Sequence, residues 1–298
     1  MLTLLITGAT GYLGSHLTQT LLDAGYRVAI LKRATSSLSR LDACLSRLNV
    51  FNIEEGLNLP FQSLGYVDAI IHTATCYGRG GENPSEVLEA NTVFPLRLLE
   101  TATSFNTDTF FNTDTFFNTN TILHKYLYAY SLSKHHFMEW GKSFADSGKI
   151  KFVNIKLEHI YGAGDNSSKF TSHVIRSCLN NVDELKLTLG EQKRDFIHID
   201  DVVSAYQYLL SNVNKIDRGF SEYGVGSGKA VTIRDFVDIV HRLTDSRTEL
   251  VFGALPYREH EIMHSEADVS GLTALGWNSR YDLETGLKQV IEQERKRP

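Results

Sequence analysis

Leu2-Thr3-Leu4-Leu5-Ile6-Thr7-Gly8-Ala9-Thr10-Gly11-Tyr12-Leu13-Gly14 is the stretch of this 298-residue chain that decides its fold. The apolar run before Gly8 is typical of a buried strand, and leucines that recur at helical spacing after it predict a helix ending near Gly25. The glycines between them let the backbone turn tightly and approach a ligand, while the N-terminus of the helix attracts phosphate. The stretch therefore predicts a dinucleotide site, with an ordinary strand-to-helix turn as the alternative.

Strands alternate with helical runs along the first half of the chain. The expected strands after the first are 26–31, 49–53, 68–73 and 109–112. This order predicts an α/β fold with a doubly wound parallel sheet of the Rossmann type, and a ligand across the carboxyl ends of its strands. Beyond about Glu158 the pattern becomes mixed, which predicts a smaller mixed α/β substrate lobe toward the C-terminus.

Composition limits the class of protein further. An apolar fraction of 42% is enough for one large core with a smaller lobe, and a net charge of −5 argues against a nucleic-acid surface. The expectations are no signal peptide and no membrane span, because no apolar run is long enough. Three scattered cysteines suggest reduced thiols in a cytoplasm, and the 11 histidines show no metal-ligand spacing, so no metal site is expected.

Tyr130 and Lys134 stand four residues apart on an expected helix and therefore share a face. A phenol has an unperturbed pKa of about 10, and a nearby cation lowers it by roughly 1–3 units. Tyr130 is thus a candidate to exchange protons with an alcohol or sugar oxygen near neutral pH. The alternative is a packed ring beside a solvated amine.

The glycine spacing and the Tyr-x-x-x-Lys pair resemble the short-chain dehydrogenase/reductase superfamily, specifically its extended branch, which acts on nucleotide sugars. Further segments that carry the resemblance are 68–74, Asn91, 157–165, 194–202, 223–228 and 274–277. The resemblance implies a cofactor site made of Gly8, Thr10, Gly11, Tyr12, Leu13, Gly14, Lys32, Arg33, Thr73, Ala74, Thr75, Asn91, Tyr130 and Lys134.

The same resemblance implies a discontinuous domain boundary. The expected NADP(H)-binding domain covers residues 1–158, and a stretch at about 196–211 returns to it. The expected substrate-binding lobe covers the rest of residues 159–298. Dimerisation through the Tyr130 helix and the helix before it is common in this fold, so a homodimer is an expectation by analogy.

A six-residue repeat complicates the choice of a catalytic threonine. The run Asn106-Thr107-Asp108-Thr109-Phe110-Phe111 recurs as 112–117 and ends in a partial copy. The resembled enzymes place a Ser or Thr just past the fifth strand, and Thr113 fits best if that strand is 109–112. Thr107 would leave no strand, Thr119 would force a long loop, and Thr115 remains a fallback.

The residues after Thr113 also bear on the type of reaction. Sugar-nucleotide dehydratases of the superfamily follow their threonine with Asp-Glu, whereas Thr113 is followed by Asp114 and Thr115. Without the second carboxylate, dehydration lacks its base. The set Thr113, Tyr130 and Lys134 is sufficient for hydride transfer coupled to proton transfer at one carbon.

Cofactor choice is expected at the end of the second strand, where an acidic residue would select NAD. This strand ends in Lys32 and Arg33, with Ser36 and Arg40 nearby, so we predict NADPH. A solvated basic turn is the alternative.

Within the extended branch, the resemblance is strongest to the 4-ketoreductases that form CDP-abequose or CDP-paratose. The carrying segments are 111–117, 152–162, 190–196 and 261–263. This implies NADPH-dependent reduction of CDP-4-keto-3,6-dideoxyglucose to CDP-abequose, for bacterial O-antigen synthesis. Tyr130 would donate the proton, with Tyr128 as the fallback.

The candidate substrate contacts are Asp114, His159, Lys169, Arg194 and Arg258. The two arginines are candidates for the substrate diphosphate because a guanidinium matches phosphate oxygens. The alternatives are an ion pair of Arg194 with the neighbouring Asp195, a solvated Arg258 and a structurally satisfied His159.

Three other functions stay open. A dTDP-4-keto-6-deoxyglucose 4-reductase would use the same residues on another nucleotide. A nucleotide-sugar 4-epimerase would retain NAD. A non-catalytic NADPH-binding regulator would be expected to have lost one of the three catalytic residues.

Overall fold

The computed structural model describes residues 2–104, 113–125 and 127–297. The chain forms two compact units, one made of 1–156 with 206–223 and the other of 157–205 with 224–298. The predicted boundary at 158 is close to this division. The predicted return at about 196–211 overlaps the observed returning segment only in part, because residues 196–205 belong to the second unit and the segment runs on to residue 223.

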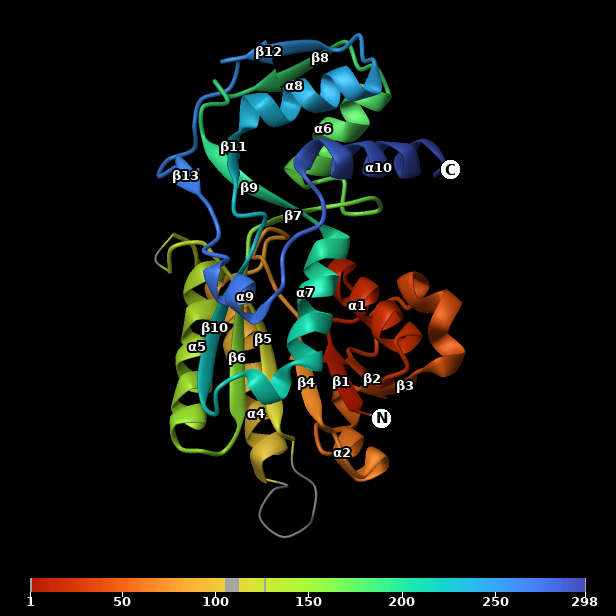
Figure 1. Ribbon diagram of the computed structural model, residues 1–298, viewed down its shortest axis with the longest axis vertical. Helices are drawn as coiled ribbons and strands as arrows, with labels where there is room; N and C mark the ends of the chain where they lie inside the picture. The colour runs from red at the N-terminus through yellow and green to blue at the C-terminus, as the bar shows by residue number, and fades with distance from the viewer. Residues whose placement is uncertain (1, 105–112, 126, 298) are drawn as a thin grey trace. The chain divides into compact units, whose positions relative to one another are not determined.

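The first unit is built on a seven-stranded sheet with the strand order β10-β6-β5-β4-β1-β2-β3 (Figure 1). The strands are β1 (Thr3–Thr7), β2 (Arg27–Lys32), β3 (Asn49–Asn52), β4 (Ala69–His72), β5 (Thr115–Thr121), β6 (Lys151–Leu157) and β10 (Phe220–Val225). The pairs β1–β2, β2–β3, β1–β4 and β4–β5 are parallel. The chain order reverses direction between β1 and β4, and such a reversal is where open α/β sheets bind nucleotides.

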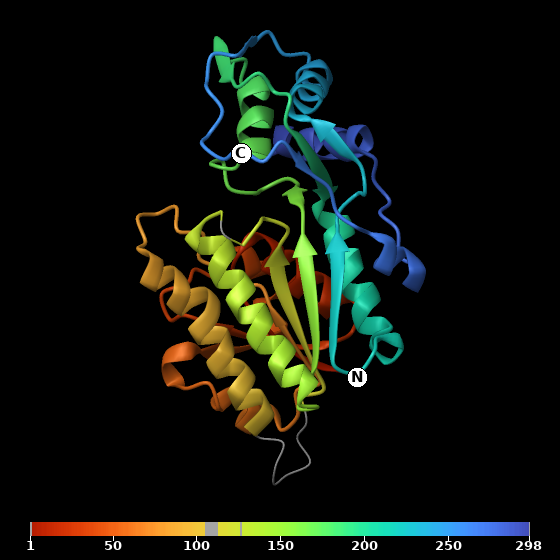
Figure 2. The ribbon, with the colours of Figure 1, turned by 90° about the vertical axis from the view of Figure 1, so that its left-hand side faces the viewer.

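Helices cover the strands of this sheet. They are α1 (Tyr12–Asp23), η1 (Ser39–Arg47), η2 (Ile53–Glu55), α2 (Leu59–Leu64), α3 (Pro84–Leu88), η3 (Glu89–Val93), α4 (Phe94–Ser104), α5 (Ala129–Asp146) and η4 (Val213–Lys215). The helix α7 (Ile199–Ser211) leads from the second unit back into the first. Figure 2 shows α4 and α5 running side by side along one face of the sheet, where they contact each other.

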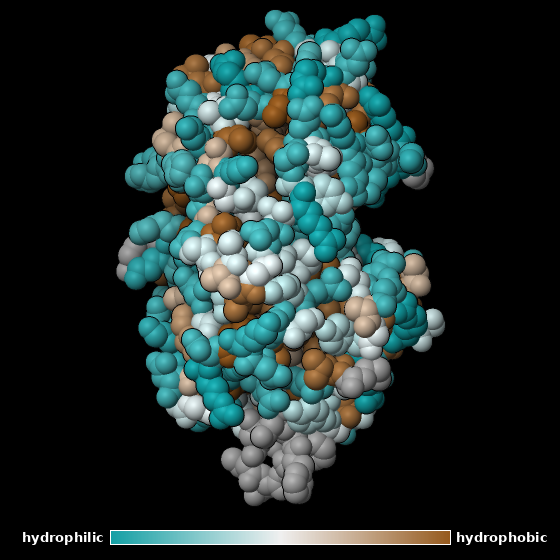
Figure 3. Space-filling model, viewed as in Figure 1, coloured by the Kyte–Doolittle hydropathy of each residue, from teal (hydrophilic) through white to brown (hydrophobic). Residues whose placement is uncertain are grey.

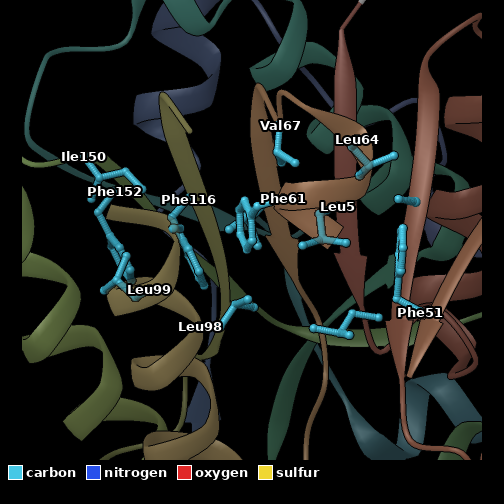
Figure 4. Close-up of a cluster of buried hydrophobic side chains, with 14 of the residues drawn as sticks. Leu5, Phe51, Phe61, Leu64, Val67, Leu98, Leu99, Phe116, Ile150 and Phe152 are labelled. Atoms are coloured by element: carbon cyan, nitrogen blue, oxygen red, sulfur yellow. The ribbon is translucent and has the colours of Figure 1, made fainter. Parts of the chain in front are cut away.

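Aromatic rings fix α5 against the sheet. The Phe116 ring in β5 lies 5.6 Å from the Phe137 ring in α5 and stacks at 5.5 Å on the Phe152 ring in β6. Leu98 and Leu99 of α4 belong to the same buried cluster (Figure 4). Pairs of this kind contribute about 0.5–1.5 kcal/mol beyond their buried area. The helix that carries Tyr130 is therefore held rigidly at its centre.

The position of the fifth strand differs from the prediction. The expected range 109–112 lies outside the described residues, whereas the observed β5 begins at Thr115 and ends at Thr121. All seven of its residues are buried, and Ala69 of β4 pairs with Thr115. The strand β5 is therefore formed by the second half of the second copy, 115–117, and the partial third copy, 118–121.

The second unit contains a small mixed sheet and a two-stranded sheet. Its strands are β7 (His159–Tyr161), β8 (Glu184–Leu187), β9 (Lys193–His198), β11 (Ala230–Thr232), β12 (Glu249–Phe252) and β13 (His264–Ser265). β9 pairs with β11 in antiparallel orientation and with β7 and β13 in parallel orientation, while β8 pairs with β12. The helices are α6 (Phe170–Leu179), α8 (Ile233–Thr244), α9 (Ser270–Leu275) and α10 (Leu283–Arg295). The Phe196 and Phe236 rings stack at 4.3 Å in its core.

On the face drawn in Figure 3, hydrophilic side chains prevail and apolar ones occur in scattered patches. Among the described helices, none combines the length and the apolar character needed to cross a membrane. The described residues also include no cluster of His, Cys, Asp and Glu that could hold a metal ion.

Candidate functional site

The glycine turn joins β1 to α1 and is closed by contacts that leave no space for side chains. Gly8 has a φ of 75°, and a Cβ there would lie 2.4 Å from the Ala74 amide nitrogen. A Cβ on Gly14 would lie 2.1 Å from the Gly8 carbonyl oxygen. Gly11 precedes the first turn of α1, and a Cβ there would lie 3.2 Å from the Gly8 carbonyl oxygen. The turn is therefore a cradle of bare backbone at a helix N-terminus, as a diphosphate requires.

The segment after β4 forms the second wall of this cradle. Both the backbone N–H and the hydroxyl of Thr73 donate to the Thr7 carbonyl oxygen, at 3.0 and 2.8 Å. Ala74 lies against Gly8, as the steric limit above shows, and Thr75 bonds back to the Thr73 carbonyl oxygen at 3.4 Å. The ends of β1 and β4 are thus joined at the point where the sheet order reverses.

Asn91 supports this wall and uses its amide on the protein itself. Its Oδ1 accepts from the Cys76 N–H at 2.8 Å, and its Nδ2 donates to the Cys76 carbonyl at 2.7 Å and to the Ser133 hydroxyl at 3.0 Å. The side chain is fully buried. Asn91 therefore holds this loop against α5, and its contact with a cofactor stays a prediction.

Lys134 is buried in α5 with 1% of its surface exposed, and its Nζ has no hydrogen-bond partner among the described residues. Burial lowers the pKa of this amine to about 7. The neighbouring His72 is also buried; its Nδ1 lies 2.7 Å from the Thr7 hydroxyl, and the Lys134 charge adds to the lowering of the His72 pKa by burial. An ammonium without a partner is costly in such a place. A ligand with hydroxyl or anionic groups would supply this partner, so the site fits a nucleotide ribose.

Tyr130 lies one helical turn before Lys134 and is half-buried. Its ring packs on the Tyr77 ring at 5.1 Å. Burial is the largest influence on its pKa and raises it; Tyr77 raises it further, whereas a hydrogen bond with the Thr121 side chain and the charge of Arg79 lower it. Burial thus favours the neutral form of both groups, and the lowering of the Tyr130 pKa by a charged Lys134 stays a prediction.

Thr113 and Asp114 were placed wrongly by the sequence prediction. Both precede β5, at the amino end of the sheet, where the Asp114 N–H donates to the Asp68 carbonyl at 3.2 Å. The Asp114 carboxylate accepts from the Tyr66 hydroxyl at 3.0 Å. The fallback Thr115 begins β5 at the same end. These three residues are therefore at the opposite end of β5 from Thr121, whose side chain interacts with Tyr130.

Thr121 is the residue that the sequence prediction missed. It ends β5, and its side chain is hydrogen-bonded with Tyr130. The other threonine near this end, Thr119, lies 2.6 Å from the Tyr206 hydroxyl instead. The partial third copy of the repeat, 118–121, is nearer to Tyr130 in sequence than the copy that contains Thr113. This shorter separation is the sequence signal that indicates Thr121.

The basic turn after β2 carries Lys32 and Arg33. Lys32 folds over the turn, with its Nζ donating to the Arg33 and Ala34 carbonyls at 3.1 and 3.3 Å, while Arg33 is exposed. A carboxylate is also present, because Glu54 accepts from the Ala34 N–H at 3.0 Å. Glu54 is thereby committed to the backbone of the turn, and the exposed cation remains available to a ligand.

Arg194 in β9 is buried and forms an ion pair with Glu261, not with Asp195. The Asp195 carboxylate instead accepts from the Ser227 and Gly228 N–H groups at 2.8 and 2.9 Å. The predicted alternative partner for Arg194 is therefore wrong. Glu261 lies on the turn of Arg258, whose carbonyl accepts from the Glu261 N–H at 3.1 Å and whose side chain is exposed.

The other candidate substrate residues of this unit also have acidic partners. The His159 Nδ1 lies 3.0 Å from the carboxylate of Glu158, which is buried and also accepts from the Ser265 hydroxyl at 2.6 Å. Lys169, which precedes α6, pairs with Asp165 at 3.0 Å. Each of these side chains is therefore held in a fixed orientation by a carboxylate.

Known proteins resemble this chain both in sequence and in fold. Residues 4–226 match the NAD dependent epimerase/dehydratase family. The chain is similar to a CDP-abequose synthase of Salmonella muenchen, with 36% identity covering 97% of this chain and 96% of that protein, and to one of Salmonella typhimurium, with 35% identity and 97% of each. Its fold is similar to the UDP-glucose 4-epimerase of Thermotoga maritima, solved with UDP-glucose, and to that of Thermus thermophilus, solved with NAD. Both have a TM-score of 0.84, 20% identity and 99% coverage of each chain. These structures confirm the Rossmann-type fold.

Proposed function

We propose that this chain, which belongs to the NAD dependent epimerase/dehydratase family, reduces the C4 keto group of a nucleotide-linked deoxyhexose. The substrate that we favour is CDP-4-keto-3,6-dideoxyglucose and the product CDP-abequose, because the similarity to CDP-abequose synthases extends over nearly the whole chain. The chemistry is carried by one observation: at the carboxyl end of β5 the Thr121 side chain interacts with the Tyr130 phenol and lowers its pKa, one helical turn from the Lys134 amine, which has no hydrogen-bond partner among the described residues.

The proposed mechanism follows from these three residues. A bound nicotinamide nucleotide supplies the hydride that the C4 carbon of the sugar accepts. Tyr130 donates its phenolic proton to the oxygen of that carbon, so that the ketone becomes a hydroxyl. Thr121 hydrogen-bonds the same oxygen as its negative charge develops, and Lys134 bonds the ribose hydroxyls of the nucleotide. A protonated Lys134 would then lower the pKa of Tyr130, which burial alone raises.

The residues that follow Thr121 in sequence support reduction over dehydration. Thr121 ends β5 and is followed by Ile122 and Leu123. Neither apolar side chain can remove a proton from the carbon beside the keto group as a carboxylate does. Thr121, like Thr113, therefore lacks the following carboxylate that a dehydratase would use.

NADPH is the proposed reductant. Arg33 is exposed at the end of β2, and the carboxylate of Glu54 is held by the Ala34 N–H. A free guanidinium at this position favours a 2′-phosphate, which forms paired hydrogen bonds with it. Titration of Arg33→Asp with NADPH and with NADH tests the choice. The ratio of the two Kd values should move toward NADH, and an unchanged ratio would refute the assignment.

Arg194 and Arg258 are the proposed ligands of the substrate diphosphate. Arg194 forms an ion pair with Glu261, and the Arg258 carbonyl accepts a hydrogen bond from the Glu261 N–H. A diphosphate carries more negative charge than the carboxylate and matches the guanidinium fork. His159 is proposed to face the sugar, with its ring oriented by Glu158.

The deciding experiment is NADPH oxidation with prepared CDP- and dTDP-linked 4-keto sugars, with and without the 3-deoxy position, followed by NMR of the product. Turnover of CDP-4-keto-3,6-dideoxyglucose alone, with an axial C4 hydroxyl, would support the proposal. Turnover of the dTDP sugar alone would refute the choice of nucleotide. Tyr130→Phe should abolish turnover but retain NADPH binding.

A 4-epimerase is the second candidate, because the two solved structures of similar fold are epimerases. This function predicts that the purified chain retains NAD and interconverts C4 epimers without added reductant. Purified protein that carries no NAD, together with steady NADPH oxidation, would exclude it.

A further inference from the structure

Amide side chains lie in the middle of the first unit's sheet, where a parallel sheet is normally apolar. Strands of such a sheet are buried on both faces and are expected to be rich in Val, Ile and Leu. Asn118 and Asn120 in β5 and Asn154 in β6 are instead polar and have exposed fractions of 0%, 3% and 0%. Buried amides are costly unless they are hydrogen-bonded, so their presence requires an explanation.

The amides form a chain of hydrogen bonds that all point the same way. The Thr121 backbone N–H donates to Asn120 Oδ1 at 2.7 Å, and Asn120 Nδ2 donates to Asn154 Oδ1 at 3.2 Å. Asn154 Nδ2 then donates to Glu222 Oε2 at 2.8 Å on the neighbouring β10. Asn118 Nδ2 adds a second donor to Asn154 Oδ1, at 2.8 Å. Asn154 is therefore the junction of the chain.

The charge of Glu222 sets the direction of these bonds. An ionised carboxylate only accepts hydrogen bonds, so Asn154 must turn its Nδ2 toward Glu222 and its Oδ1 toward β5. Lys156 donates to the other carboxylate oxygen at 2.9 Å and holds it in place. Hydrogen bonds aligned head to tail polarise one another, so the chain holds its members more firmly than separate bonds would.

The chain of hydrogen bonds ends at Thr121, the residue whose hydroxyl is bonded with Tyr130. We propose that Asn154, anchored by Glu222, is a positioning residue for catalysis. It fixes the carboxyl end of β5 and thereby the Thr121 hydroxyl beside the phenol. This inference rests on the proposed reaction at Tyr130, and it adds residues of β6 and β10 to those that determine the geometry of the site.

The kinetic test compares loss of the junction with its reversal. Asn154→Leu removes both the donor and the acceptor and should lower kcat about 10- to 100-fold, the effect of a misplaced catalytic group, with KM for NADPH unchanged. The double variant Asn154→Asp/Glu222→Gln exchanges donor and acceptor at constant total charge. It should restore kcat to within about threefold of the parent, a loss of less than one neutral hydrogen bond. Failure of the double variant to recover would overturn the proposal.

A matched control separates positioning from loss of stability. Val153→Ala lies in the same strand and removes buried apolar volume beside Asn154, but leaves the amides intact. It should lower Tm and keep kcat. If Asn154→Leu likewise lowers only Tm, its role is structural and the proposal is wrong. Should Asn154→Leu not fold, Glu222→Ala removes only the anchor, at a partly exposed side chain, and should lower kcat about threefold to tenfold.

A second readout needs no substrate. In protein labelled with 13Cζ-tyrosine and bound to NADP, the Tyr130 resonance is assigned by its loss in Tyr130→Phe. Asn154→Leu and Glu222→Ala should shift this resonance, and Val153→Ala should not. An unmoved resonance would overturn the positioning role. A shifted resonance in a protein that reduces no 4-keto sugar would uphold the positioning role and refute the proposed function, so the two failures are distinguishable.

Discussion

Nucleotide binding should take up a proton at Lys134, which makes the affinity fall as the pH rises. In the structure this amine is buried, has no hydrogen-bond partner among the described residues and has a pKa of about 7. Ribose hydroxyls and nucleotide phosphates favour its charged form. The pKa is therefore expected to rise on binding toward the usual value of about 10.4.

The size of the effect follows from these two pKa values. If the bound amine regains its usual pKa, Kd should rise about 50-fold between pH 7 and pH 9, or about 2.3 kcal/mol. Calorimetric titration of NADPH at several pH values, in buffers of different ionisation enthalpy, gives both Kd and the number of protons taken up. Lys134→Met is the control, because it keeps the apolar stem and removes the titrating group. A Kd that does not change with pH, or an equal slope in Lys134→Met, would refute the reasoning.

The pH dependence of stability is opposite to that of nucleotide affinity: the affinity falls as the pH rises, whereas the contribution of Lys134 to the free energy of unfolding rises. Between pH 7 and about 10, the unfolded chain holds a proton on Lys134 that the folded chain lacks. The contribution of this residue to the free energy of unfolding therefore becomes more favourable as the pH rises through that window. Chemical denaturation of the parent and of Lys134→Met across the same pH range should show the difference.

Three further results are expected. Thr121→Val should lower kcat about 10- to 100-fold by removing the bond to Tyr130, whereas Thr113→Val should not; equal effects in steady-state assays would contradict the register of β5. Glu261→Gln should raise the affinity for CDP about three- to tenfold in low-salt calorimetry, because it removes a competing charge from Arg194, and a weaker affinity would show that the carboxylate is needed. Gly14→Ala should abolish the rise in Tm on NADPH addition, since its Cβ meets the Gly8 carbonyl; a retained rise would mean that the turn can adapt.

The predictable parts of this fold are those that depend on neighbours in sequence. The glycine turn and the spacing of Tyr130 and Lys134 follow from local patterns, and the structure has both in the expected elements. The position of the fifth strand does not, because three copies of the repeat have nearly identical neighbours. Only the pairing of Thr115 with Ala69, on the neighbouring strand, fixes which residues of the repeat form β5.

Contacts between distant residues explain the other differences. Arg194 and Glu261 are 67 residues apart, so the sequence offered the adjacent Asp195 as the more obvious partner. The lowered pKa of Lys134 arises from burial by the fold, whereas the helical spacing suggested a charged amine beside the phenol. The direction of a pKa shift requires the environment of the group, which spacing alone does not give.

The glycine turn also limits the paths by which this sequence can change. A Cβ on Gly8 or Gly14 would meet backbone atoms of Ala74 or Gly8, and no substitution elsewhere removes a backbone atom. A Cβ on Gly141 would instead meet the Phe152 ring, 2.1 Å away, which a smaller residue would vacate. In a selection for restored function, a lesion at Gly141 should thus acquire suppressors at Phe152. A substitution at Gly8 or Gly14 should be rescued only by return of glycine at that position. These two glycines are therefore expected to stay fixed as the sequence evolves.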